Sequence, residues 1–121
     1  LNNQVTIYSN PTNEKLDFLY NSSFASIIPE KSGGGFKLKI IEALSHGLPI
    51  VAQKEAVKGT GLTNNYDCLS VDSPNDYLNA IIKLENIDFR RKIIKNGFSS
   101  ILNIYSSNTA KKTFKDAIKT I

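Results

Sequence analysis

Three consecutive glycines followed by a lysine-bearing apolar segment form the part of this sequence that is best suited to chemistry. Gly33, Gly34 and Gly35 precede the segment FKLKIIEALSH, and Gly47 follows it. Apolar residues recur in the segment at three- and four-residue spacing, which predicts a helix over residues 36–46. A glycine loop at a helix N-terminus leaves backbone N–H groups free, and the helix dipole adds partial positive charge there. The pattern therefore predicts an anion site that suits a phosphorylated ligand.

Two lysines, Lys37 and Lys39, lie in the first turn of this helix. The helix dipole disfavours cations at that end, and a bound phosphate would remove the conflict. Lys37 falls on the apolar side of a helical wheel. Its long stem can lie along the edge of the core while its ammonium group reaches the glycine loop. Lys37 is therefore the expected phosphate contact.

A narrow polar strip on the same helix contains Lys39, Glu42 and His46. One interpretation is a solvated strip, in which Lys39 and Glu42 pair at i,i+3 and His46 is an i+4 neighbour. The other is that the Glu42 carboxylate accepts hydrogen bonds from a sugar diol. The pattern leaves both open. His46 is expected to be a surface residue at the helix end, where the dipole favours it.

Hydrophobic periodicity and capping residues predict alternating strands and helices along the rest of the chain. Strands are predicted over residues 5–8, 24–28, 50–52 and 67–71. Further helices are predicted over residues 13–22, 74–84, 89–105 and 108–121. Thr12 or Asn13 is expected to cap the first of these helices, Ser73 the next and Asp88 the third. Residues 55–65 are predicted to form a loop.

This alternation predicts an α/β fold, a Rossmann-like parallel sheet of about four short strands flanked by helices, with a helical C-terminal third. Such sheets bind ligands at the carboxyl ends of their strands. Three loops, over residues 9–12, 30–35 and 54–65, are expected to gather there. The glycine loop is one of them, which agrees with the anion site inferred from local chemistry.

Composition limits the classes that remain. The length of 121 residues predicts one domain, residues 1–121, with a sizeable core. The single cysteine, Cys68, and the single histidine, His46, exclude an internal disulfide and a zinc site built from these residue types. Cys68 lies in a predicted strand and is expected to be a small core residue. There is no apolar run of about 20 residues and no signal-peptide pattern, so a cytoplasmic location is expected.

The net charge of +4 is unevenly distributed. The segment from Phe89 onward carries +7, and the preceding segment carries −3. Solvated helical faces account for this pattern, because the lysines are spread out and lack the interleaved aromatic residues that bind nucleic acid. The sequence therefore predicts no nucleic-acid partner. An anionic membrane surface is the alternative partner for the basic segment, at the inner face of the membrane.

The stretch GGGFKLKIIEALSHGLPIVA resembles the C-terminal signature of group 1 glycosyltransferases, which have the GT-B fold and retain anomeric configuration. The preceding VTIYSN, the Leu19–Tyr20 pair and SFASIIPE are also similar to that family, as is the later DCLSV. The likeness covers nearly the whole chain. No P-loop, GxGxxG or GxSxG motif is present to suggest another enzyme class, and the patterns of related epimerases or phosphorylases are not visible.

The resemblance implies a donor-binding domain for a nucleotide-sugar such as a UDP- or GDP-sugar, with no metal or other cofactor required. In the family, the residues matching Gly33, Gly34, Gly35 and Phe36 hold the donor diphosphate, and the lysine matching Lys37 often assists. The glutamate matching Glu42 hydrogen-bonds the ribose hydroxyls, and the loop matching residues 9–11 borders the base. The implied mechanism is front-face substitution, in which the donor phosphate helps to deprotonate the acceptor. Cell-surface polysaccharide synthesis is the expected process.

Two departures from the family pattern bear on this expectation. Many members have a glutamate eight positions before the ribose glutamate, where this chain has Gly34, and a glycine-rich subset also lacks it. The chain also matches only the later part of the second, C-terminal domain of a GT-B enzyme. A larger parent enzyme with an N-terminal acceptor domain is therefore expected, and this part alone is expected to be inactive. A homodimer through exposed sheet edges and a non-catalytic interaction or assembly module are the alternatives.

Overall fold

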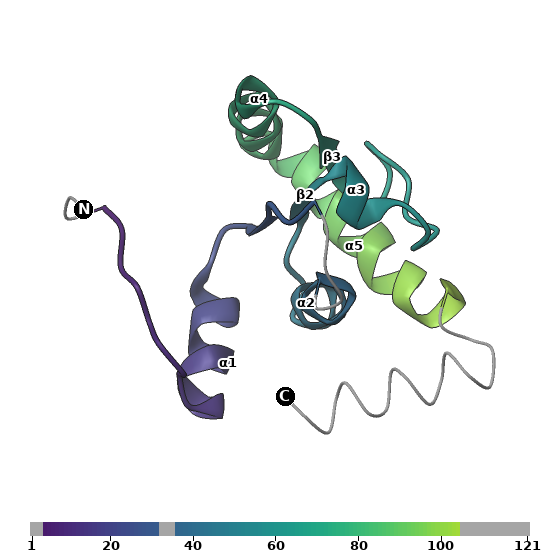
Figure 1. The fold of residues 1–121 in the computed structure, drawn as a ribbon. Helices are drawn as coiled ribbons and strands as arrows, with labels where there is room; N and C mark the ends of the chain where they lie inside the picture. Colours follow the sequence, from purple (N-terminus) through teal and green to yellow (C-terminus); the bar gives the residue numbers. More distant parts are fainter. Residues whose placement is uncertain (1–3, 32–35, 105–121) are drawn as a thin grey trace.

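A three-stranded parallel sheet forms the centre of the computed structural model, which describes residues 4–31 and 36–104 (Figure 1). The strands are β1 (Ser26–Ile28), β2 (Ile50–Gln53) and β3 (Leu69–Val71), and their order in the sheet is β1-β2-β3. The parallel α/β fold expected from the sequence is confirmed. The described sheet has three strands, one fewer than expected.

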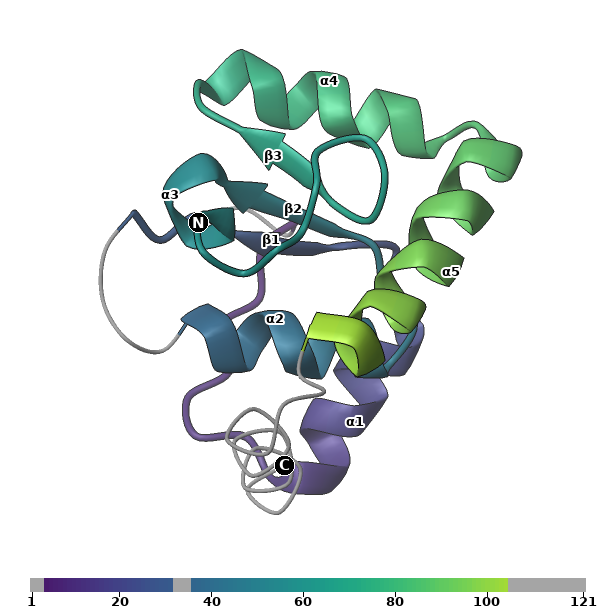
Figure 2. The same cartoon turned by 90° about the vertical axis from the view of Figure 1, so that its right-hand side faces the viewer.

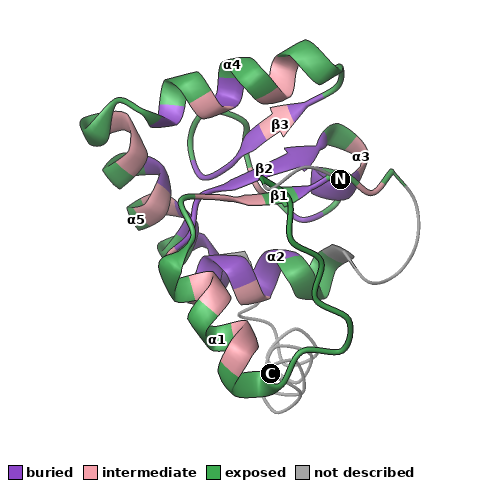
Figure 3. Ribbon diagram, turned by 90° about the vertical axis from the view of Figure 1, so that its left-hand side faces the viewer, coloured by how far each residue is buried: buried purple, intermediate pink, exposed green. Residues whose placement is uncertain are grey.

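The central strand β2 is buried along its whole length (Figure 3). It pairs with β1 through Ile27–Val51 and with β3 through Val51–Leu69. The central strand of a parallel sheet is covered on both faces, so the run Ile50, Val51 and Ala52 is apolar on both sides. Ile50 and Ala52 face one core cluster, and Val51 faces the other, as the two-residue period of a strand requires.

Helices cover both faces of the sheet (Figure 2). They are α1 (Asn13–Ser22), α2 (Phe36–Ser45), α3 (Lys54–Val57), α4 (Pro74–Leu84) and α5 (Ile87–Ile104). Helix α2 packs on one face through Ile40 and Leu44, and α4 packs on the other through Ala80 and Leu84. The long helix α5 runs past one end of the sheet and contacts both α2 and α4. These two apolar layers hold the strands in register.

Helices α1 and α4 have the bounds that the sequence predicts. Thr12 caps α1, because its side-chain oxygen accepts a hydrogen bond of 3.1 Å from the Lys15 N–H. Helix α4 begins at Pro74, and the Asp76 carboxylate accepts a 2.9 Å hydrogen bond from the N–H of Ser73. Helix α5 begins at Ile87, because Asn86 and not Asp88 is its cap. The Asn86 side-chain oxygen accepts a 3.0 Å hydrogen bond from the Phe89 N–H.

The predicted strand over residues 5–8 is wrong. These residues are exposed and lie in an irregular segment away from the sheet (Figure 1). Their β-branched and aromatic composition favours a strand, but a strand also requires a neighbour to pair with, and the described sheet does not include them. The loop over residues 9–12 therefore does not follow a strand, so its expected place at the carboxyl edge is not found.

Three smaller corrections concern the second half of the chain. The predicted loop over residues 55–65 includes most of α3, a single helical turn. The predicted strand over residues 67–71 begins at Leu69, because Asp67 lies in the preceding turn and Cys68 forms an isolated bridge with Asn64. The predicted helix over residues 108–121 lies outside the described residues. Within the described part of the chain, no helix is both long and apolar enough to cross a membrane.

Candidate functional site

The carboxyl ends of the three strands meet at one edge of the sheet, because all of the strands are parallel. Glu30 follows β1, Lys54 begins α3 directly after β2, and Asp72 follows β3. Helix α2, which begins at Phe36, also starts from this edge. Open parallel sheets bind ligands at this position. The carboxyl edge is therefore the candidate site, as predicted.

Lys39 is held by Glu30 across this edge, with its ammonium nitrogen in direct contact with Glu30 Oε1. The hydrogen bond from Lys39 is the main cause that lowers the pKa of the Glu30 carboxyl. The carboxyl therefore stays ionised. Of the two interpretations of the polar strip, the one that pairs Lys39 with Glu42 does not hold, because Glu30 reaches Lys39 instead. A protein carboxylate thus balances one of the two lysines at the start of α2.

A second polar group at the carboxyl edge surrounds Gln53, which is only 2% exposed. The Tyr77 hydroxyl donates a 2.8 Å hydrogen bond to Gln53 Oε1, and Gln53 Nε2 donates a 3.1 Å bond to the backbone oxygen of Asp72. Burial raises the pKa of Tyr77, and the negative charges of Glu30 and Glu55 raise it further. The Tyr77 hydroxyl thus links α4 to the end of β2.

Glu30 and Glu55 each keep one buried carboxylate oxygen, Oε2, that has no hydrogen-bond partner among the described residues. Such an oxygen lacks the hydrogen-bond partner that buried polar atoms usually have. Sequence reasoning missed Glu30, Gln53 and Glu55. The available signal was their position, because all three lie within three residues after the end of a predicted strand of a parallel sheet.

The residues predicted to bind the anion are only partly described. Gly33, Gly34 and Gly35 lie outside the described residues, as does the side chain of Phe36, which is the first residue of α2. Lys37 is exposed in the first turn of α2. The anion site at the glycine loop therefore stays a prediction, and the position of α2 at the carboxyl edge is compatible with it.

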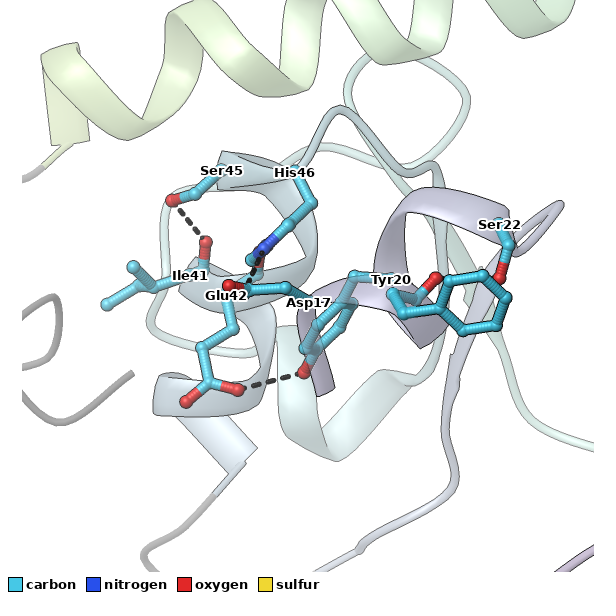
Figure 4. A network of polar contacts seen from close by, with 8 residues as sticks. Asp17, Tyr20, Ser22, Ile41, Glu42, Ser45 and His46 are labelled. Atoms are coloured by element: carbon cyan, nitrogen blue, oxygen red, sulfur yellow. Dashed lines mark hydrogen bonds and ion pairs between the residues drawn. The ribbon is translucent and has the colours of Figure 1, made fainter. Parts of the chain in front are cut away.

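Glu42 lies in the middle of α2 on the side that faces α1 (Figure 4). Its Oε2 accepts a 2.9 Å hydrogen bond from the hydroxyl of Tyr20 on α1. Burial, then this hydrogen bond and the charge of Glu42, raise the pKa of Tyr20 well above its usual value. Tyr20 is therefore a neutral donor at physiological pH. The sequence did not predict this contact, because its partners are 22 residues apart.

His46 completes a cluster with Asp17, Tyr20 and Glu42 (Figure 4). Its ring stacks on the Tyr20 ring with centroids 4.6 Å apart and an interplanar angle of 16°. Its Nδ1 lies 2.7 Å from the Glu42 backbone oxygen, and its Nε2 lies 3.2 Å from Asp17 Oδ1. His46 lies at the end of α2, as predicted, but it is half-buried, with 16% of its side chain exposed. The docking of α1 covers it.

Cys68 is fully buried in the main core cluster, as predicted. Burial raises the pKa of its thiol to about 12, and the neighbouring charge of Asp67 adds to this effect. A thiol that stays protonated is a poor nucleophile. Within residues 4–31 and 36–104, no group of three or more His, Cys, Asp or Glu side chains is arranged to hold a metal ion.

A hollow of about 450 Å³ lies beside β3 and α4, away from Lys37 and Glu42. It is lined by Asn64, Asn65, Leu69, Ser70, Val71, Asp76, Asn79, Ala80 and Lys83. At this edge of the sheet, the Asn64 side-chain oxygen accepts a 2.9 Å hydrogen bond from the N–H of Ser70. Asn64 thus occupies a backbone donor that an additional strand would need.

Comparison with known proteins finds a distant relative. The chain is 27% identical over 118 residues to an uncharacterized 44.6 kDa protein in the cps region of Klebsiella pneumoniae. The match covers 97% of this chain and 30% of that protein, so the chain spans less than a third of the relative's length. No family model matches the chain. No solved structure matches it either.

Proposed function

We propose that this chain is the donor-binding part of a retaining glycosyltransferase that acts in polysaccharide synthesis. One observation carries the proposal: α2, with a triglycine segment before it, starts from the carboxyl edge of a parallel sheet and presents Glu42 further along. A cps region is a capsular polysaccharide locus, so the location of the relative suggests a role in polysaccharide synthesis. The resemblance of the sequence to group 1 glycosyltransferases supplies the finer function.

The proposed ligand is a nucleoside diphosphate sugar. The backbone N–H groups of Gly33, Gly34, Gly35 and Phe36 bind the diphosphate, and the exposed Lys37 adds a charge-assisted hydrogen bond. Glu42 accepts hydrogen bonds from the ribose hydroxyls. It lies six residues beyond the start of α2, about 9 Å along the helix axis, which suits a ribose next to the diphosphate.

The transferred sugar is proposed to lie toward Glu30 and Glu55. Their buried, unpartnered oxygens are acceptors for hydroxyl groups. These two carboxylates stand in for the sugar-binding glutamate that this chain replaces with Gly34. Transfer itself requires an acceptor-binding domain in the parent protein, so the chain alone is expected to bind donor without transferring the sugar.

Titration with UDP and GDP, followed by NMR, tests the proposal. Lys37→Ala is expected to weaken binding by about ten- to a hundredfold, because a hydrogen bond to a charged group contributes about 1.5–3 kcal/mol. Lys95→Ala is the matched control, since Lys95 is also exposed but lies on α5, away from the carboxyl edge. No shifts in residues 33–42 with either nucleotide, or equal effects of the two variants, would refute the proposal.

A second candidate function is an interaction or assembly module, and the outer edge of β1, which pairs with no other strand in the described part of the chain, favours it. Ile27, in the middle of this edge strand, is 52% exposed, and Phe24 just before it is also exposed. Exposed edge strands pair readily with other chains. Sedimentation of the wild-type protein and Ile27→Lys separates the two. A dimer that this variant dissociates supports the module, and a monomer that binds nucleotide supports the donor domain.

An anionic membrane surface is the remaining proposed partner, through the basic C-terminal segment. Co-sedimentation with anionic vesicles at low and high salt tests it. Exposed charges are screened over about 8 Å at physiological ionic strength, and over shorter distances as the salt concentration rises. Binding at low salt that is lost at high salt is therefore expected. A lack of binding at low salt would remove the membrane from the proposal.

A further inference from the structure

We propose that Tyr20 is a positioning residue that orients the Glu42 carboxylate toward the ribose diol of the nucleotide, and that His46 and Asp17 hold Tyr20 in place. This inference rests on the proposed function and adds a specificity determinant to it. Its basis is the cluster that joins α1 to α2 (Figure 4).

The hydrogen bond between Tyr20 and Glu42 engages only half of the carboxylate. The hydroxyl donates to Oε2 at 2.9 Å, and the other oxygen points away from Tyr20 (Figure 4). A carboxylate has about four lone-pair positions, so Glu42 keeps enough acceptors for two ribose hydroxyls. Tyr20 therefore fixes the carboxylate without saturating it.

The orientation matters because a glutamate side chain has several rotatable bonds. A free Glu42 would have to lose this rotamer freedom when a ligand binds, and the loss would reduce affinity. In this structure the Tyr20 hydroxyl has already selected one orientation. Side chains held in this way give precise ligand sites.

Tyr20 is itself held on its ring face by His46, at a centroid distance of 4.6 Å. Both His46 nitrogens face acceptors, the Glu42 backbone oxygen at Nδ1 and the Asp17 carboxylate at Nε2. These two contacts fix the plane of the imidazole, and the stacked ring then fixes the phenol. No residue of α1 is fully buried, so α1 has no core residue of its own to fix it. Side-chain contacts such as these therefore provide most of the support for Tyr20.

Tyr20→Phe tests the inference, because it removes the hydroxyl and keeps the ring that stacks on His46. The probes are UDP and GDP with their 2′-deoxy counterparts, and the readout is the ratio of the two dissociation constants. Wild-type protein is expected to prefer the ribonucleotide, and Glu42→Gln to lose that preference. Tyr20→Phe is expected to weaken ribonucleotide binding about three- to tenfold and to affect the 2′-deoxynucleotide less.

A merely structural role of Tyr20 would weaken both nucleotides equally and leave the ratio unchanged. Tyr66→Phe is the matched control, since Tyr66 is exposed in the turn before β3 and removal of its hydroxyl should change neither constant. An unchanged ratio in Tyr20→Phe, with Glu42→Gln still altering it, overturns the positioning role alone. If the wild-type protein binds neither ribonucleotide, the proposed function fails and this role fails with it.

Discussion

Gly97, in the middle of α5, is packed closely against α2 and the turn before β3. A Cβ atom at this position would lie 2.8 Å from Leu44 Cδ2 and 3.2 Å from the backbone oxygen of Asp67. Leu44 is buried in the main core cluster. The Asp67 carboxylate accepts 2.7 Å hydrogen bonds from the Thr63 N–H and the Ser100 hydroxyl. Neither neighbour can move away freely.

Gly97→Ala is therefore expected to destabilise the protein, although alanine is the better helix former. The helix gains about 1 kcal/mol from the substitution. Overpacking a filled site costs about 1–3 kcal/mol, and this methyl group meets both a core side chain and the backbone. The net loss in the free energy of unfolding is expected to be about 1 kcal/mol, or about 3–6 °C in melting temperature for a chain of this size.

Urea unfolding followed by circular dichroism measures this loss. Ser99→Ala is the matched control, because Ser99 is exposed on the same helix and gains helix propensity without a new contact. A few tenths of a kcal/mol of stabilisation are expected for Ser99→Ala. If Gly97→Ala protein is as stable as wild type, the reasoning that α5 packs tightly against α2 at Gly97 is refuted.

Two further predictions concern ionisable groups. The N–H groups of Ser73 and Asp72 lower the pKa of Asp76 below its ordinary 3.8, so the ionised form stabilises α4 above about pH 4 and this stability is lost as the pH falls through the lowered value. Asp76→Asn is expected to flatten the acid side of the curve of unfolding free energy against pH in urea titrations, and an unchanged slope would contradict the capping role. The Cys68 thiol, with a pKa of about 12, is expected to react with a disulfide reagent at pH 8 at least a hundredfold more slowly in native protein than in denaturant. Rapid labelling under native conditions would show that Cys68 is not buried.

The sequence predicted best what depends on neighbours in the chain. The bounds of α1 and α4 follow from capping residues and helical spacing that lie within a few residues of each other. The burial of Cys68 follows from its place in an apolar segment. The strand over residues 5–8 was predicted on the same local grounds and is wrong, because the existence of a strand depends on a partner elsewhere in the chain.

Most of the candidate site depends on contacts that no local pattern contains. Tyr20 reaches Glu42 from a different helix, and Glu30 reaches Lys39 across the end of the sheet. A helical wheel shows which side of α2 a residue occupies but not what packs there, so His46 was placed at the surface. The position of α2 at the carboxyl edge was predictable, because parallel topology alone determines it.

The two outer strands of the sheet, β1 and β3, differ in how open their outer edges are. On the β3 side, the Asn64 side-chain oxygen already accepts the hydrogen bond of the Ser70 N–H. This backbone donor is therefore not available to a strand outside the sheet. On the β1 side, Ile27 meets solvent and the ladder ends without a comparable cover among the described residues. Among the described residues, the β1 side is therefore the more open edge for any continuation of the sheet, from elsewhere in a longer polypeptide or from another molecule. In the described part of the chain, the sheet is thus capped at a β3 backbone donor and open beside β1.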